Sequence, residues 1–235
     1  MRVKLISHTP NPDIVCAAAA YTTIKDKPPS ELFKELMKDK KRAEKVLRNV
    51  VGYGHHSVIE HAYFTFSIEG ISRSCSHQLV RHRMASYSQQ SQRYVKFEEM
   101  NYVTPKTVKG AVKAKYDKKM GEIADFYREM LDAGIPAEDA RFVFPNAAHT
   151  NIVVTMNARS LMNFFGIRCC YNAQWEIKGL ADKMLVEARK VAPVIFEKAG
   201  PRCLHYGYCP EGARTCGRIT EVRGEYERGA KGKGK

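Results

Sequence analysis

Two long stripes of apolar residues constrain the fold of this chain more than any other feature of its sequence. One stripe runs through residues 107–131 and the other from Ile177 to Ile195, with apolar positions three and four apart. That spacing places the apolar side chains on one face of an α-helix. Strand-like alternation is short and follows no regular series with the helices; it covers residues 3–7, 62–68 and 150–156. We therefore predict an α+β fold with long amphipathic helices and a small mixed or antiparallel sheet.

Shorter helical patterns and a polar tail complete the predicted organisation. The helical patterns cover residues 13–23, 30–51, 71–83 and 157–168, with Ser30 as an expected N-cap. A loop rich in Ser and Gln follows the third pattern. We expect one domain over residues 1–200 and a flexible, basic, cysteine-containing extension over residues 201–235, which ends in GAKGKGK.

The charge of the chain limits the partners it can have. Its 235 residues include 39 Lys and Arg but only 25 Asp and Glu, a net charge of +14 that attracts anions. The apolar stretch at residues 14–21 is too short for a membrane span or a secretory signal, and the odd number of seven cysteines favours reduced thiols. We expect a cytoplasmic protein. Because neither a GxGxxG nor a GxxxxGK[ST] motif occurs, Rossmann and P-loop folds have no support.

A basic segment rich in amides is the strongest candidate for a binding site. The stretch RHRMASYSQQSQRY, from Arg81 to Tyr94, contains three arginines and a histidine but no Asp or Glu. A solvated basic loop is the plain alternative. However, Arg141, Arg159 and Arg168 also lie in otherwise apolar segments, where a buried guanidinium needs an anionic partner. We predict that phosphate-bearing ligands supply the missing counter-anions.

Three other chemistries stay open at this point. The segment HHSVIEH could bind zinc, although it lacks the HExxH spacing. In the tail, Cys203, His205, Cys209 and Cys216 could complete a tetrahedral zinc site, although their spacing matches no common finger. Cys75 could be a nucleophile, but no obvious base accompanies it. We predict neither a bound metal nor a nucleophilic thiol.

Taken together, the motifs resemble the signature of the flavin-dependent thymidylate synthases. RHR, seven further residues and Ser91 form the family's pattern, which continues as Gln92-Arg93-Tyr94. GHHSVIEH, HQLVRHR, ARFVFP, NARSLMNFFGIR and AQWEI follow in the family's order, so the resemblance covers roughly residues 1–200. It implies a homotetramer whose active sites form at subunit interfaces, with FAD held by several chains.

The resemblance also implies a reaction. In it, dUMP receives a one-carbon unit from 5,10-methylenetetrahydrofolate, NADPH reduces the flavin, and dTMP and tetrahydrofolate are released. No enzyme cysteine takes part, and neither nucleic acid nor a membrane is a partner. The rival hypothesis is a nucleic-acid-binding protein that uses the same basic surface, which predicts salt-dependent binding to oligonucleotides and a colourless protein.

Site residues follow from the resemblance, position by position. Those expected to contact FAD are His55, Ser57, Arg81, His82, Arg83, Gln89, Asn157, Arg159 and Asn163. Those expected to contact dUMP are Gln78, Leu79, Val80, Arg81, Gln89, Gln90, Ser91, Gln92, Arg93, Arg141 and Arg168. Arg168 is the predicted catalytic residue, because a guanidinium against N3 of uracil and its carbonyl would stabilise developing negative charge. Gln89 stands where some members of the family carry Glu.

Overall fold

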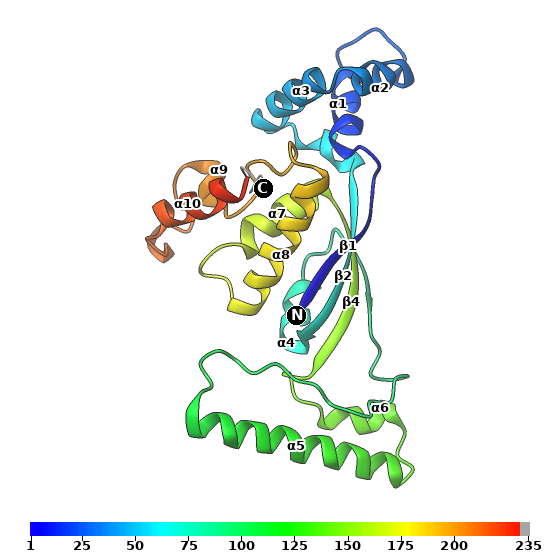
Figure 1. Ribbon diagram of the computed structural model, residues 1–235, viewed down its shortest axis with the longest axis vertical. Coiled ribbons are helices and arrows are strands. Elements are labelled where there is room, and N and C mark those ends of the chain that lie inside the picture. Colours follow the sequence, from blue (N-terminus) through cyan, green and yellow to red (C-terminus); the bar gives the residue numbers. More distant parts are fainter. Residues whose placement is uncertain (231–235) are drawn as a thin grey trace. The chain divides into compact units, whose positions relative to one another are not determined.

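The computed structural model describes residues 1–230, with side chains up to residue 227 (Figure 1). Its strands are β1 (Arg2–His8), β2 (Tyr63–Ser72), β3 (Ser86–Gln89) and β4 (His149–Asn157). Its α-helices are α1 (Pro12–Thr22), α2 (Pro29–Lys38), α3 (Lys40–Gly52), α4 (Arg73–Leu79), α5 (Gly110–Asp132), α6 (Ala137–Ala140), α7 (Ala158–Arg168), α8 (Trp175–Val191), α9 (Arg202–Tyr206) and α10 (Ile219–Ala230). Short 3-10 helices are η1 (His56–His61), η2 (Arg141–Val143) and η3 (Gly212–Arg214). None of the helices in this described part is long and apolar enough to cross a bilayer.

The strands form one sheet in the order β1-β2-β4-β3. β2 and β4 run antiparallel: Thr65 meets Thr155 through a 3.0 Å hydrogen bond, while beyond the other end of β2 the N–H of Arg73 donates to Ala148 O at 3.0 Å. Burial alternates along both strands, as their period-two sequence pattern predicts. The predicted α+β class with a small sheet is confirmed, and the sheet is antiparallel.

The chain folds into two compact units, and β2 and β4 contribute residues to both. Unit 1 consists of residues 1–2, 68–81 and 87–153. Unit 2 consists of residues 3–67, 82–86 and those from 154 onward. Each unit has packing of its own.

The core of unit 2 is aromatic. Phe64 on β2 and Phe165 on α7 both pack edge-on against Phe196, with ring centroids 5.2 and 5.8 Å away. All three rings are fully buried. Edge-to-face pairs contribute roughly 0.5–1.5 kcal/mol beyond their buried area. These rings pack β2, α7 and the segment after α8 against one another.

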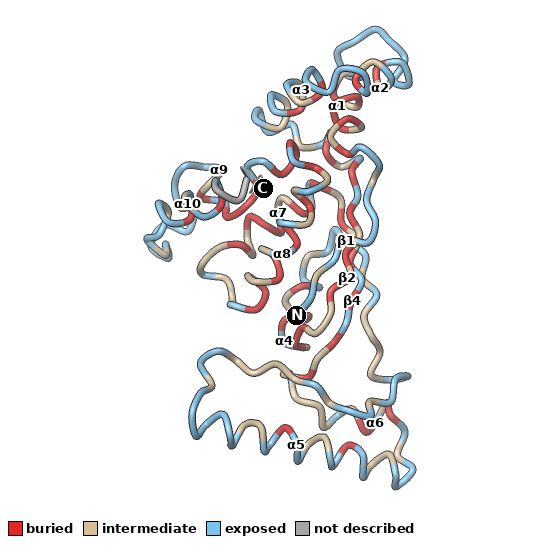
Figure 2. The backbone as a smooth tube through the Cα atoms, viewed as in Figure 1, coloured by how far each residue is buried: buried red, intermediate tan, exposed pale blue. Residues whose placement is uncertain are grey.

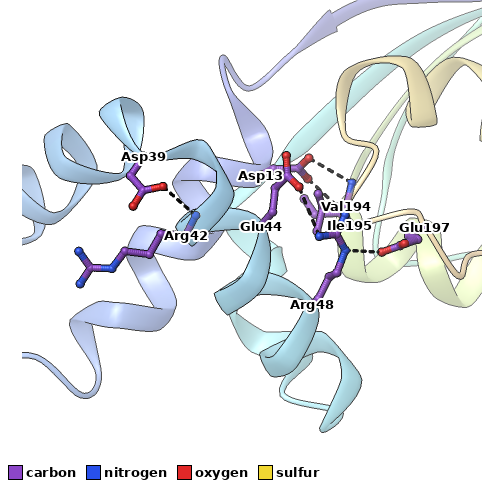
Figure 3. A network of polar contacts seen from close by, with 8 residues as sticks. All are labelled: Asp13, Asp39, Arg42, Glu44, Arg48, Val194, Ile195 and Glu197. Carbon is purple, nitrogen blue, oxygen red and sulfur yellow. Dashed lines mark hydrogen bonds and ion pairs between the residues drawn. The ribbon is translucent and has the colours of Figure 1, made fainter.

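One carboxylate ties helix α1 to the chain that follows α8 (Figure 3). Asp13 accepts hydrogen bonds from the backbone N–H groups of Val194 and Ile195, both at 3.1 Å. Burial raises the pKa of Asp13, while these two donors act in the opposite direction. Arg48 on α3 donates to Glu197 at 2.8 Å beside this contact. Helices α1 and α3 are thus joined to the segment after α8 by hydrogen bonds.

Unit 1 is organised around α5 and the short helices after it. Tyr127 on α5 packs on Phe144, with ring centroids 4.4 Å apart, and Phe97 meets the same ring edge-on at 5.7 Å. The long helix predicted over residues 107–131 is confirmed. Only Met120 and Tyr127 of α5 are buried, however, so the described residues cover a small part of its apolar stripe (Figure 2).

Two predicted helices begin or end elsewhere. Residues 30–51 form α2 and α3, because Asp39 ends the first helix and caps the second by accepting the N–H of Arg42 at 3.0 Å. Ser30 lies inside α2, which follows Pro28, so it is not the N-cap. The helix predicted over residues 71–83 is α4 alone: Ser72 still belongs to β2 and caps α4, which ends at Leu79.

The segment after residue 200 contains helices α9 and α10. Val222 and Tyr226 on α10 are buried, and the Tyr226 hydroxyl donates to Asp182 on α8 at 2.5 Å. Arg189 on α8 donates to the carbonyl of Ala199 at 2.8 Å. Residues 231–235, most of the predicted flexible GAKGKGK end, lie outside the described residues. The domain boundary at residue 200 stays a prediction.

Candidate functional site

The basic segment that begins at Arg81 is shared between the two units. Arg81 and residues 87–94 belong to unit 1, whereas residues 82–86 belong to unit 2. The predicted site residues therefore form two groups. Most positions predicted for dUMP lie in unit 1, and most of those predicted for FAD lie in unit 2 together with Arg168.

In unit 1, two glutamines on and after β3 are fixed by their neighbours. The side-chain amide of Gln89 donates to Ser76 Oγ and to Thr150 Oγ1, both at 3.0 Å. The N–H of Gln90 donates to Asn151 O at 2.8 Å, and its Oε1 accepts from Asn151 Nδ2 at 3.0 Å. The sequence predicted a loop here. β3 was missed because it has only four residues, all polar, and its stability comes from these contacts rather than from an apolar pattern.

The turn that follows presents Arg93. Ser91 Oγ accepts the backbone N–H groups of Arg93 and Tyr94 at 3.1 and 3.4 Å. The guanidinium of Arg93 lies 5.2 Å from the Tyr94 ring and donates through Nε to Glu138 at 2.5 Å. The prediction that only ligands supply counter-anions is thus wrong for Arg93. Its carboxylate partner lies 45 residues further along the chain, where no local pattern reveals it.

Arg141 and Arg73 extend this basic cluster. Arg141 Nε donates to the backbone carbonyl of Glu138 at 2.9 Å. Burial, followed by the charge of Arg141, lowers the pKa of Arg73. Arg93 pairs with the Glu138 side chain, whereas Arg141 contacts only the Glu138 backbone, so positive charge exceeds negative charge in this cluster. Arg73 was not predicted as a member of this cluster, although it directly follows a strand and lies among serines.

Two of the predicted nucleotide contacts line a pocket in unit 1. Gln90 and Gln92 border a cavity of about 280 Å³, together with His149 and Asn151. Its walls carry amide and imidazole groups that can both donate and accept hydrogen bonds. The cavity offers room for a small polar ligand.

In unit 2, His82 and Arg168 form a hydrogen-bonded pair. Arg168 Nε donates to His82 Nε2 at 3.0 Å. The His82 ring packs edge-on against Phe164 of α7, with centroids 4.9 Å apart. Burial, and then the charge of Arg168, lower the pKa of His82 to about 4. The imidazole is therefore neutral at pH 7 and acts as an acceptor that orients the charged guanidinium.

Helix α7 positions three further predicted residues. Asn157 is its N-cap and accepts the backbone N–H three residues later at 2.8 Å. Arg159 is exposed and pairs with Glu60 of η1 at 2.5 Å. Asn163 accepts from Arg202 at 3.2 Å. The expectation that Arg159 lies in apolar surroundings without a protein carboxylate is wrong, because it faces outward on a helix whose other side is buried.

The remaining predicted positions lie around the end of α4 and the start of η1. Because α4 ends at Leu79, Gln78 lies on the helix, whereas Arg81 and His82 follow it. Leu79 is buried, and its carbonyl accepts the hydroxyl of Tyr87 at 2.9 Å. Val80 is partly exposed, and His55, Ser57, Arg81 and Arg83 are exposed.

Two exposed arginines, Arg81 and Arg83, lack a carboxylate partner among the described residues. Among ion pairs within the described residues, none involves Arg81 or Arg83. Cys75 is fully buried in α4. Over residues 1–230, no three His, Cys, Asp or Glu side chains are gathered as in a formed metal centre.

The comparison with protein families decides the assignment. Residues 4–194 match the model of a family described as thymidylate synthase complementing protein. This chain belongs to that family. The resemblance drawn from the motifs is thereby confirmed, and the matched range includes both the basic segment and α7.

Named relatives of this chain support the same family assignment. A flavin-dependent thymidylate synthase of Geobacter sulfurreducens is 52% identical over 229 residues, which cover 95% of this chain and 97% of the relative. Proteins of the same name from Clostridium tetani and Pyrococcus furiosus are each 46% identical and cover 96% and 90% of this chain. They are themselves covered over 97% and 90% of their lengths. Since 95% of 235 residues is about 223, the first match extends beyond residue 200.

Proposed function

We propose that this chain converts dUMP to dTMP by reductive methylation, with 5,10-methylenetetrahydrofolate as one-carbon donor and NADPH as reductant. As a family member it is a flavin-dependent thymidylate synthase with FAD as cofactor. The balanced reaction takes dUMP, methylenetetrahydrofolate, NADPH and a proton to dTMP, tetrahydrofolate and NADP⁺. The methylene carbon and a hydride become the new methyl group. The observation that supports a catalytic site most directly is the pairing of Arg168 with a neutral His82.

For dUMP, the basic cluster of unit 1 is suited to the phosphate. The Arg93–Glu138 ion pair is largely solvent-exposed, so a dianionic phosphate can take the place of the carboxylate at little cost. Arg141 adds a second cation that already contacts the Glu138 backbone. We assign nucleotide binding to these residues and to Gln78, Leu79, Val80, Arg81, Gln89, Gln90, Ser91, Gln92 and Arg168.

For FAD, exposed arginines fit a pyrophosphate. Arg81 and Arg83 are exposed, and Arg159 faces outward from α7, so bidentate contacts to phosphate oxygens are available without a glycine-rich loop. We assign FAD binding to His55, Ser57, Arg81, His82, Arg83, Gln89, Asn157, Arg159 and Asn163. When bound, FAD carries reducing equivalents from NADPH. The chain's part is to bind, orient and shield it.

Arg168 is assigned to the uracil ring. A guanidinium held against N3 and the adjacent carbonyl stabilises negative charge that develops as the ring is activated. His82 accepts from the Nε side of Arg168 and so fixes the plane of the guanidinium. A protonated imidazole could not do so, because it lacks the lone pair. The low pKa of His82 is therefore part of the proposed site.

We also propose that the enzyme is a cytoplasmic homotetramer with active sites at subunit interfaces, and that neither nucleic acid nor a membrane is its partner. The partly uncovered stripe of α5 and exposed apolar side chains support burial against other copies. Phe142 is 81% exposed and Met84 is 78% exposed. Large apolar side chains in such numbers on a surface favour a protein interface.

The choice of co-substrates is tested by omission. Purified flavin-containing protein is supplied with dUMP, methylenetetrahydrofolate and NADPH, and each of these three is left out in turn. We expect dTMP only in the complete mixture, with one NADPH oxidised per dTMP. Equal dTMP formation without the folate, or without NADPH, would refute the assigned donor or reductant.

The nucleic-acid hypothesis is tested on the same preparation. A flavoenzyme is yellow and retains flavin through gel filtration, whereas a nucleic-acid-binding protein is colourless. Binding to a single-stranded oligonucleotide is then measured over a range of salt concentrations. Tight, salt-dependent oligonucleotide binding by a colourless protein would favour the rival.

A further inference from the structure

Four cysteine side chains line one pocket in unit 2. Cys170 follows α7, Cys203 lies on α9, and Cys209 and Cys216 lie on the chain between α9 and α10 (Figure 1). The pocket has a volume of about 320 Å³. All seven cysteines of the chain are free thiols, so no disulfide holds this group together. None of these thiols has a part in the proposed reaction.

The four cysteines border one cavity, so thiolates formed there would repel one another. Mutual repulsion of thiolates is the effect that a bound cation reverses. Arg202 lines the same pocket, and its charge offsets part of the negative charge that a metal tetrathiolate carries.

The segment that carries two of the thiols has no apolar core of its own. Residues 207–218 read GYCPEGARTCGR and contain no Val, Ile, Leu, Met or Phe. Cys209 and Cys216 are half-buried, whereas every other residue of this segment is exposed. Burial of two thiols cannot by itself fix a segment of twelve residues. Small polar segments of this kind are commonly held by disulfides or by a metal.

We propose that Cys170, Cys203, Cys209 and Cys216 bind one zinc ion, which fixes residues 207–218 to the end of α7. Four thiolates form the tetrahedral set that Zn²⁺ prefers in structural sites, at about 2.3 Å from each sulfur. Binding releases the thiol protons to solvent and involves no oxidation. Since no three such ligands are already gathered among the described residues, the thiols turn inward about their side-chain torsions as zinc enters.

This ligand set differs from the one that the sequence alone suggested. His205 is exposed, packs against Tyr206 with ring centroids 5.3 Å apart, and lines a different pocket with Arg189. Cys170 takes its place as the fourth ligand, because it lines the thiol pocket. It is 33 positions before Cys203, too far for a spacing pattern to reveal.

The experiment measures zinc in the full chain, purified without chelator from zinc-containing medium, by elemental analysis. We expect about one zinc ion per chain, released when a mercurial titrates the thiols. Cys209→Ala and Cys216→Ala should each lower the zinc content at least fivefold. Metal content is the readout, so the result does not depend on whether the proposed enzyme activity is correct.

Two matched comparisons identify the ligands. Cys170→Ala should lose zinc, whereas Cys169→Ala should keep it, because the neighbouring Cys169 is fully buried and its thiol interacts with Asp182 and Tyr226. His205→Ala should also keep it. Folding of each variant is followed by circular dichroism. Wild-type protein that stays metal-free after addition of zinc, contains iron instead, or has these cysteines joined as disulfides would overturn the proposal.

Discussion

Burial of the His82 ring against Phe164 decides which member of the His82–Arg168 pair carries the charge. With a pKa of about 4, His82 is a neutral acceptor at physiological pH, and Arg168 remains the cation. Burial is the first cause of the low pKa and the charge of Arg168 is the second, while the ring packs edge-on against Phe164. This is the residue-scale basis of the proposed activation of uracil.

Substitution of Arg168 tests that role. We expect Arg168→Ala to lower kcat about 100- to 1,000-fold, the usual effect of losing one donor that stabilises developing charge. FAD content should remain close to that of the wild type, because the assigned flavin contacts are other residues. Arg168→Lys is the matched control: it keeps the charge but loses the Nε–H that His82 accepts, and its kcat should lie between the two. Retention of activity within about tenfold in Arg168→Ala, only ~1.4 kcal/mol of barrier, contradicts the role.

The pKa of His82 also predicts a pH dependence of stability. Its folded value of about 4 lies below the ordinary value of 6.5, so between these values the unfolded chain binds a proton that the folded chain does not. Stability is then complete above about pH 6.5 and decreases as the pH falls toward 4. His82→Gln retains an acceptor without titrating, so its free energy of unfolding should depend less on pH in this window, by at most about one proton. Identical slopes for the variant and the wild type in urea unfolding would show that His82 is not responsible.

At the scale of single elements, α7 determines the arrangement of the unit 2 candidates. Its buried face carries Phe164 and Phe165, and its N-cap fixes where the helix starts. Arg159 and Asn163 are one turn apart and Arg168 ends the helix, so their spacing is set by helix geometry. A change at the cap therefore affects every candidate on the helix.

Two substitutions of Asn157 distinguish its effect on stability from its effect on cofactor binding. Asn157→Ala should lower the free energy of unfolding by about 1 kcal/mol through loss of the cap. Asn157→Asp preserves the cap and should restore stability, but its carboxylate would repel a flavin phosphate. We expect urea unfolding to show recovery in the Asp variant and flavin titration to show weaker FAD binding. Undiminished FAD affinity in Asn157→Asp would remove this residue from the proposed flavin site.

The sequence predicted most of these elements because their signals are local. Residues 157–168 show a clean apolar face, and α7 forms there with Asn157 as its first residue outside the helix. The periodic pattern did not predict features that depend on other contacts. Asn151 contacts the end of β3, and Asp39 separates α2 from α3. Carboxylate partners such as Glu60 escaped prediction because 99 residues separate it from Arg159.

On the scale of the whole molecule, the excess of positive charge matches the proposed ligands. A net charge of +14 is unfavourable for a compact chain unless anions bind, and nucleotide, flavin and folate all bring negative charge. Some arginines already have a carboxylate partner within the chain: Arg93 pairs with Glu138, and Arg159 pairs with Glu60. These exposed ion pairs hold the guanidinium groups in position, and a ligand phosphate can replace the carboxylate when it binds.

The proposed assembly is directly measurable. Four chains of 26.7 kDa give 4 × 26.7, or about 107 kDa. Light scattering coupled to gel filtration should find this mass. Phe142→Asp, at an 81% exposed apolar position, should shift the population toward smaller species if that surface is an interface. A wild-type monomer with full activity would contradict active sites shared between subunits.

The most direct test of the central claim is the detection of dTMP itself. Flavin-replete protein is incubated with dUMP, methylenetetrahydrofolate and NADPH, and the products are separated by liquid chromatography and identified by mass. We predict dTMP, tetrahydrofolate and NADP⁺ in equal amounts from the wild type, and a rate at least about 100-fold lower from Arg168→Ala. Oxidation of NADPH by the flavin-loaded protein without any dTMP would contradict the account.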